Sequence, residues 1–241
     1  MGKLDENSRK RKNAETKGQN NVDKNLCTCY NVCMQKTMSG VRNETLRKIS
    51  DVFHHGNGYA RTKDLIEKGI HQRDIKLALE NGTLVRIKNG LFRYSEAPLI
   101  SNQGLIDVSL SVPEGVICLL SALSYYELTT FNPTFISVAI PRNSWKPKIE
   151  YPPVEIYYFS KTQFEAGIDN VKIGDFNVRI YCPEKTIGDC FRHRNKLGLD
   201  IAKEGLTEYL KRKDRNLEKL LQYAEVCRVK QLIQTWLNAL I

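Results

Sequence analysis

Long apolar runs are missing from this sequence of 241 residues. A membrane-spanning helix needs about 20 consecutive apolar residues, and the strongest run, Val116 to Leu120, is far shorter. The basic start of the chain is not followed by the apolar stretch that a secretory signal peptide requires. These absences predict a cytoplasmic protein with no membrane partner.

The common sequence signatures of catalysis are also missing. The chain has no G-x-S-x-G elbow, no phosphate-binding P-loop, no H-E-x-x-H zinc motif and no dinucleotide glycine pattern. The most suggestive cluster is Asp189, Cys190 and His193, in which the aspartate and the histidine lie one helical turn apart. A surface Asp–His pair beside a packed cysteine is the commoner explanation, so we expect no catalytic residues, no cofactor and no enzymatic activity.

Paired cysteines with metal-binding spacing are scarce. None of the seven cysteines forms a Cys-x-x-Cys pair. Cys27, Cys29 and Cys33 follow a C-x-C-x-x-x-C spacing, but no fourth ligand stands near them. We therefore expect no metal site, and we expect the cysteines to be reduced, as is usual in a cytosolic chain.

Excess positive charge is present, and it is confined to one end. The net charge is +10. Residues 1–40 carry 8 Lys/Arg and 4 Asp/Glu, residues 41–95 carry 11 and 6, and residues 96–241 carry 18 and 17. A basic small domain joined to a nearly neutral larger one is typical of a nucleic-acid-binding protein with a separate second module. A need for solubility alone would explain a positive net charge, but not the concentration of that charge in the first 95 residues.

The first 95 residues divide into a tail and a small domain. Residues 1–37 offer almost nothing apolar before Leu26, which predicts a disordered basic tail. From Asn43 the apolar positions recur at helical spacing. Thr62 is a plausible N-cap for a short second helix over 63–68, and a third helix is predicted over 72–81. Strands over 84–87 and 91–94 flank Asn89-Gly90, which favours a type I′ hairpin turn.

Helix, short helix, helix and hairpin is the order of a winged helix-turn-helix, predicted here for residues 41–95. Gln72, Arg73 and Lys76 lie off the apolar stripe of the third helix, where a major groove would accept them. The hairpin would be the wing, with Arg86 and Lys88 directed toward backbone phosphates. The candidate DNA-binding residues are Thr62, Lys63, His71, Gln72, Arg73, Lys76, Arg86, Lys88 and Asn89.

The remainder, residues 98–241, predicts a larger α+β domain with a small sheet followed by helices. An apolar helix is expected over 113–128, strands over 134–140 and 153–159, and a hairpin over 171–181 that turns at Gly174-Asp175. Helices are expected over 183–195, 200–212, 216–226 and 229–240. Arg192, Arg194 and Lys196 form a second basic patch, typical of a solvated face.

Three stretches in this order resemble a known family. They are "GYARTKDLIEKGIHQRDIKLALENGTLVRIKNGLFRY", "LLSALSYYELT" followed by "PTFISVAIPR", and "CPEKTIGDCFRHRNKLGLDIAKEGLTEYL". Together they are similar to AbiEi-type regulators, the antitoxins of abortive-infection (type IV) toxin–antitoxin systems. The resemblance covers about residues 41–241. One departure is His71, where family members often carry a Ser or Thr helix cap.

The resemblance implies an N-terminal winged-helix domain that binds operator DNA and represses its own operon. It also implies a C-terminal domain needed for antitoxin activity. The cognate toxin would be a nucleotidyltransferase-like protein, and it would be a functional partner rather than a directly bound one. Two other hypotheses stay open: a nucleic-acid-acting enzyme or nuclease-associated factor, and a pure protein-interaction module.

Overall fold

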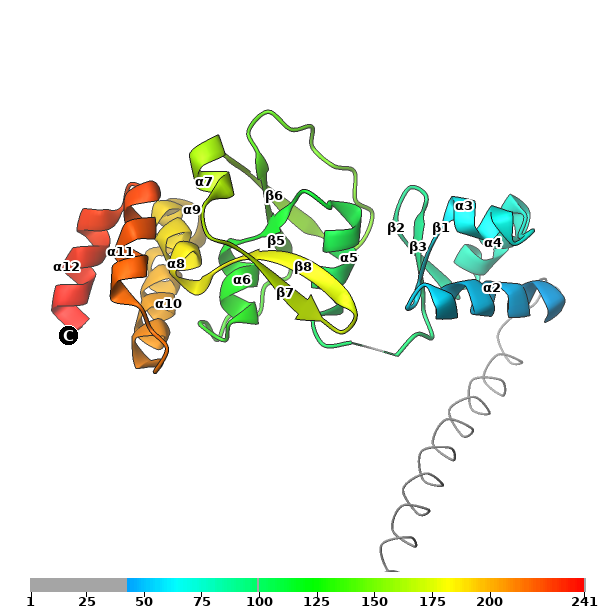
Figure 1. Cartoon of the computed structure of the whole chain (residues 1–241), viewed down its shortest axis with the longest axis horizontal. Helices are drawn as coiled ribbons and strands as arrows, with labels where there is room; N and C mark the ends of the chain where they lie inside the picture. Colours follow the sequence, from blue (N-terminus) through cyan, green and yellow to red (C-terminus); the bar gives the residue numbers. More distant parts are fainter. Residues whose placement is uncertain (1–42, 99, 241) are drawn as a thin grey trace, which may run out of the picture.

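A computed structural model describes residues 43–98 and 100–240, and it has a mixed α+β fold. The tail predicted to be disordered, residues 1–37, lies outside these residues, as do Cys27, Cys29 and Cys33. Figure 1 shows two parts in a row, with the N-terminal elements at one end and a group of C-terminal helices at the other. No helix within the two described segments is long and apolar enough to cross a membrane.

The N-terminal unit, residues 43–95, has the predicted order of helices and hairpin. Its elements are α2 (Asn43–His55), β1 (Tyr59–Arg61), α3 (Thr62–Glu67), α4 (Gln72–Glu80), β2 (Leu84–Lys88) and β3 (Leu91–Tyr94). The three strands form an antiparallel sheet in the order β1-β3-β2. Apolar residues from the helices and from the sheet share one buried cluster, including Ile49, Phe53, Leu65, Ile75 and Phe92.

The strand β1 was not predicted, and the start of α3 differs by one residue from the prediction. Thr62 is the first helical residue, and Arg61 occupies the cap position. The backbone N–H of Arg61 donates to Asp64 Oδ2 at 2.8 Å, so a carboxylate three residues ahead fixes the helix start. The prediction of Thr62 as the N-cap is therefore wrong by one position.

The second domain is built around a mixed five-stranded sheet. Its first elements are α5 (Gln103–Ser111), β4 (Val116–Ile117), α6 (Leu119–Tyr125), β5 (Ile136–Pro141), β6 (Val154–Phe159), α7 (Lys161–Glu165), β7 (Ile168–Ile173) and β8 (Phe176–Tyr181). The strand order is β6-β5-β4-β8-β7. Strands β5 and β6 pair in parallel, as do β4 and β8, while β7 and β8 form the predicted hairpin.

The single helix predicted over 113–128 is wrong. Val116 and Ile117 form the short central strand β4, and the helix α6 starts only at Leu119. A short apolar run fits a buried strand as well as a buried helix, because both of its faces are covered. The helix α5, which precedes this strand, was not predicted.

The C-terminal part is helical, as expected. Its elements are α8 (Pro183–Arg192), α9 (Arg194–Leu197), α10 (Leu199–Lys211), α11 (Leu217–Val226) and α12 (Lys230–Leu240). Helix α8 packs against α6, α10 and α11, and these helices share a buried cluster with the sheet. The helix predicted over 183–195 is divided in two, because His193 ends α8 and lies before α9.

The two parts are packed together. Tyr59, Ile87 and Leu91 of the N-terminal unit belong to a buried cluster that also contains Ile106 and Val178 of the second domain. The hairpin therefore has an apolar face against the second domain, in addition to its place in the N-terminal sheet. This contact decides which of the predicted site residues remain free.

Candidate nucleic-acid interface

Helix α4 separates an apolar stripe from a polar face. Ile75 and Ala78 are buried, whereas Gln72, Arg73 and Lys76 are exposed. This division follows from the helical repeat, because positions three residues apart share a face. The Lys76 ammonium lies 3.8 Å from the Glu80 carboxylate, and both side chains are largely exposed. A pair of this kind contributes little to stability, so the Lys76 ammonium remains free to find another partner.

A tight turn places α4 directly after α3. Gly69 has φ +75°, a conformation that glycine adopts without strain, and Ile70 N–H donates to Leu65 O at 3.0 Å. His71 precedes α4 at the cap position, makes no side-chain cap hydrogen bond, and is exposed. The helix therefore starts at Gln72 without a Ser or Thr cap, and the His71 imidazole faces solvent beside Gln72 and Arg73.

The start of α3 lies against the turn of the hairpin. Thr62 N–H donates to Gly90 O at 3.1 Å, and Lys63 is exposed at the first turn of the helix. Within the hairpin, Gly90 has a positive φ of +77°, whereas the φ of Asn89 is not positive. The predicted type I′ turn is therefore wrong, because that turn requires positive φ at both central residues. Asn89 itself is exposed at the turn.

Of the two cations of the hairpin, Lys88 is bound by the second domain, whereas Arg86 is exposed. Lys88 Nζ donates to Ser111 O at 2.7 Å. Partial burial, and secondarily the nearby Arg61 guanidinium, lower the pKa of Lys88. Arg86 Nη1 lies 4.0 Å from Glu150 Oε1. Lys88 therefore does not extend outward as predicted, because the hairpin packs against the second domain. The pair of Arg86 with Glu150 is a weak surface pair, and the predicted role of Arg86 stays a prediction.

A buried polar cluster joins the two parts. Tyr59 Oη donates to Asp107 Oδ1 at 2.5 Å and accepts from Gln103 Nε2 at 2.5 Å. Arg93 Nη1 lies 3.3 Å from Asp107 Oδ2. Burial raises the pKa of Asp107, opposed by the Tyr59 hydroxyl and the Arg93 guanidinium. Buried polar groups of this kind require their partners, so the cluster fixes how the N-terminal unit meets the second domain.

The Asp–His pair predicted on the surface of the second domain is wrong. Asp189 is fully buried, and its partner is the equally buried Lys185 at 2.5 Å. The thiol of Cys227 donates to Asp189 Oδ1 at 3.2 Å. Burial raises the pKa of Asp189, opposed by the Lys185 ammonium. The K-x-x-x-D spacing was the sequence signal for this pair, and its complete burial makes it a structural element of the core.

His193 lies beside this pair without joining it. Its ring stacks on Phe159 at 5.7 Å between centroids and meets Tyr157 edge-on. Burial lowers the pKa of His193, while the Asp189 charge opposes that shift. The Arg192 guanidinium donates to Cys227 O at 3.1 Å, so it binds the end of α11 instead of lying free in a basic patch.

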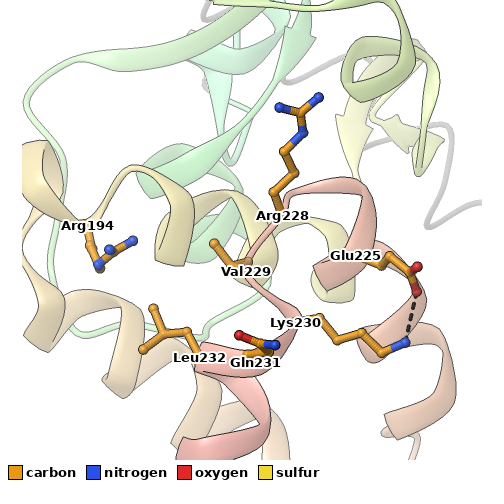
Figure 2. A pocket seen from close by; sticks show the side chains of 7 residues that line it. All are labelled: Arg194, Glu225, Arg228, Val229, Lys230, Gln231 and Leu232. Carbon is orange, nitrogen blue, oxygen red and sulfur yellow. Dashed lines mark hydrogen bonds and ion pairs between the residues drawn. The ribbon is translucent and has the colours of Figure 1, made fainter.

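A cationic groove lies between α9 and the start of α12. It has a volume of about 360 Å³. Its lining residues are Arg194, Glu225, Arg228, Val229, Lys230, Gln231 and Leu232. Lys230 Nζ donates to Glu225 Oε2 at 2.9 Å. Figure 2 shows this contact as a dashed line and the Arg228 side chain extending away from both residues. Only Arg194 of this set belongs to the basic patch predicted from the sequence, because the fold brings the other residues to it from the end of α11, the following loop and the start of α12.

No group of three or more histidine, cysteine or carboxylate side chains with metal-binding geometry occurs within residues 43–98 and 100–240. The four cysteines described in these segments, Cys118, Cys182, Cys190 and Cys227, are free and buried. Burial raises the pKa of each thiol, which disfavours the thiolate needed for nucleophilic attack or metal binding.

Comparison with known proteins gives a likeness in fold. No model of a known protein family matches the chain, and no curated protein sequence matches it. Among solved structures, the chain is similar to the crystal structure of the RV2827C protein from Mycobacterium tuberculosis, with a TM-score of 0.51 and 12% sequence identity. The match covers 84% of this chain and 83% of that one. The α+β arrangement of both parts therefore occurs in a protein of almost unrelated sequence.

Proposed function

We propose that this protein is a sequence-specific DNA-binding transcriptional regulator, in which residues 43–95 act as a winged helix-turn-helix. The observation that carries the proposal is the polar face of α4. Gln72 and Arg73 are exposed at its first turn, while the opposite stripe is buried. An amide and a forked guanidinium on a rigid helix match the donor and acceptor patterns of base edges in a major groove.

The concentration of charge supports the same conclusion. Of the net charge of +10, residues 1–95 carry nine units, because residues 96–241 hold 18 Lys/Arg against 17 Asp/Glu. Lys63 and Lys76 add exposed ammonium groups beside Gln72 and Arg73. Phosphate contacts by such groups supply affinity and position the protein, whereas the α4 side chains supply discrimination between sequences.

We further propose that the regulator is an autorepressing antitoxin of a type IV toxin–antitoxin system. This proposal rests on the resemblance of residues 41–241 to AbiEi-type regulators. The implied partner is a nucleotidyltransferase-like toxin, countered without a stable complex. Co-expression of the full chain with a nucleotidyltransferase-like toxin should restore the growth that the toxin alone arrests. Continued growth arrest would remove the antitoxin role and leave DNA binding as a separate question.

DNA binding is tested with the full chain and a duplex selected from random sequences by repeated binding. Arg73→Ala should cost about 1–3 kcal/mol on the selected duplex and blur discrimination at one base position. The matched control is Arg228→Ala, an exposed arginine of the second domain. The control should leave affinity nearly unchanged. Equal losses on selected and scrambled duplexes for Arg73→Ala would show that α4 does not discriminate sequence, and failure to bind any duplex would favour a protein-interaction module.

A further inference from the structure

The loop that joins β5 to β6, residues 142–153, reaches from the second domain to the hairpin of the N-terminal unit. The backbone N–H groups of Glu150 and Tyr151 both donate to Ile87 O, at 3.0 and 3.2 Å. Ile87 lies at the irregularity in the β2–β3 pairing, between Arg86 and Lys88, where its carbonyl is available to another partner. Figure 1 shows this loop extending toward the hairpin. The loop is thus fixed beside the wing.

The composition of this loop differs from that of the rest of the second domain. Arg142, Lys146 and Lys148 are exposed cations. Its one acidic residue, Glu150, faces Arg86 of the hairpin at 4.0 Å. The second domain is nearly neutral over residues 96–241, yet this short loop carries three cations against one carboxylate. A local excess of positive charge therefore adjoins the most basic part of the chain.

The loop also displays Trp145, whose side chain is 95% exposed. Tryptophan normally has most of its surface covered, since its large ring gains more from burial than most side chains. At this exposure the indole contributes almost nothing to the fold. Tryptophan is also among the residues that dominate binding interfaces when a partner covers them. Its position between cations favours a partner with both negative charge and flat or apolar surface.

The loop adjoins elements that carry candidate DNA-binding residues. Thr62, at the start of α3, bonds to Gly90 in the hairpin turn, and Ile87 of the same hairpin bonds to Glu150 in the loop. Lys63 lies at one end of this series and Lys148 at the other. The start of α3, the hairpin and the β5–β6 loop are therefore neighbours in this order.

We propose that the β5–β6 loop is a second contact for double-stranded DNA. This proposal rests on the proposed function of α4. Lys146 and Lys148 bind phosphates beside the sequence that α4 contacts, and the Trp145 indole packs on the sugar edges of the adjacent minor groove. Cations grip phosphates without base readout, and apolar side chains are common where proteins enter a minor groove. The loop thereby supplies the phosphate contacts that were predicted for the hairpin, because Lys88 of the hairpin is bound to Ser111.

Tryptophan fluorescence tests this contact directly, because the chain has two tryptophans, Trp145 and Trp236. Trp236 lies on α12 with Lys203 Nζ 4.3 Å from its ring centre, far along the chain from the loop. In the Trp236→Phe variant, emission comes from Trp145 alone. Adding the selected duplex should change that emission and reduce its quenching by acrylamide. In the Trp145→Phe variant, the remaining Trp236 emission should stay constant at the same degree of DNA binding.

Affinity and salt dependence provide a second measurement. Trp145→Ala should weaken duplex binding about tenfold, the order of loss expected when a tryptophan covered by a partner is truncated. Replacing both Lys146 and Lys148 with alanine should reduce the slope of log affinity against log salt by about two units. The matched control replaces Lys161 and Lys213, two exposed lysines of the same domain, with alanine. It removes the same charge and should leave the slope unchanged.

The outcomes separate this proposal from the one on which it rests. If Arg73→Ala weakens duplex binding while Trp145 emission and the salt slope stay constant, the loop contact is wrong and the DNA-binding function stands. If no duplex binds, both proposals fall. If Trp145 responds only to single-stranded oligonucleotides, the loop contact with duplex DNA is overturned. An equal change of slope in the Lys161 and Lys213 control would also overturn it, because the effect would then be one of total charge.

Discussion

The N-terminal unit and the second domain use their charged side chains differently. In the first, Lys63, Arg73 and Lys76 face solvent and leave the packing to apolar residues. In the second, Lys185 and Asp189 are both fully buried and bind each other inside the core. Charge that faces water contributes little to stability. The exposed cations of the N-terminal unit are therefore available for a ligand, whereas Lys185 and Asp189 of the second domain are committed to its fold.

The largest expected effect is the loss of stability when the buried pair of Lys185 and Asp189 is broken. Lys185→Ala leaves the Asp189 carboxylate without its ammonium partner, and such a change costs about 3–5 kcal/mol of unfolding free energy. Unfolding in urea measures the loss. The double variant Lys185→Met with Asp189→Leu removes both charges and should recover most of the stability, since apolar residues can replace a buried ion pair. A loss below about 1 kcal/mol in the single variant would contradict this expectation, because it would show that the pair contributes no more than a surface ion pair.

A smaller loss is expected where the two parts meet. Tyr59→Phe removes the hydroxyl that donates to Asp107 and accepts from Gln103, leaving buried polar groups short of a partner. The cost should be about 1–3 kcal/mol of unfolding free energy. The control is Tyr158→Phe, which removes a hydroxyl from a half-exposed ring. Equal stability of the two variants would mean that the polar cluster does not hold the N-terminal unit to the second domain.

Local patterns were sufficient to predict most of the N-terminal unit. Leu46, Ile49 and Phe53 repeat at helical spacing because all three lie on the buried face of α2. Gly69 follows α3 and has the left-handed conformation with which glycine commonly ends a helix. Exposure of Gln72 and Arg73 also followed from the repeat of α4. In each of these cases the decisive interactions are close in sequence.

Features that depend on distant contacts could not be predicted in this way. The direction of Lys88 is set by the carbonyl of Ser111, in another domain. The strand at Val116 and Ile117 exists because β5 and β8 flank it, and the same apolar letters alone also fit a helix. The pairing of Asp189 with Lys185 required knowing that this turn of α8 is enclosed by α6, α10 and α11. Long-range packing overrides local pattern at all three places.

The smallest expected effect is the difference between two lysines of the N-terminal unit, Lys63 and Lys88. Lys63 is exposed on α3, whereas Lys88 Nζ is bound to Ser111 O. If Lys63 binds one phosphate, Lys63→Ala should reduce the slope of log affinity against log salt by about one unit, on selected and scrambled duplexes alike. Lys88→Ala should leave the slope unchanged and instead lower the unfolding free energy, because its ammonium already has an acceptor. A salt titration of both variants, with urea unfolding in parallel, measures the two quantities. A reduced slope for Lys88→Ala with unchanged stability would show that the hairpin leaves the second domain to bind DNA, and the two lysines would then share one role.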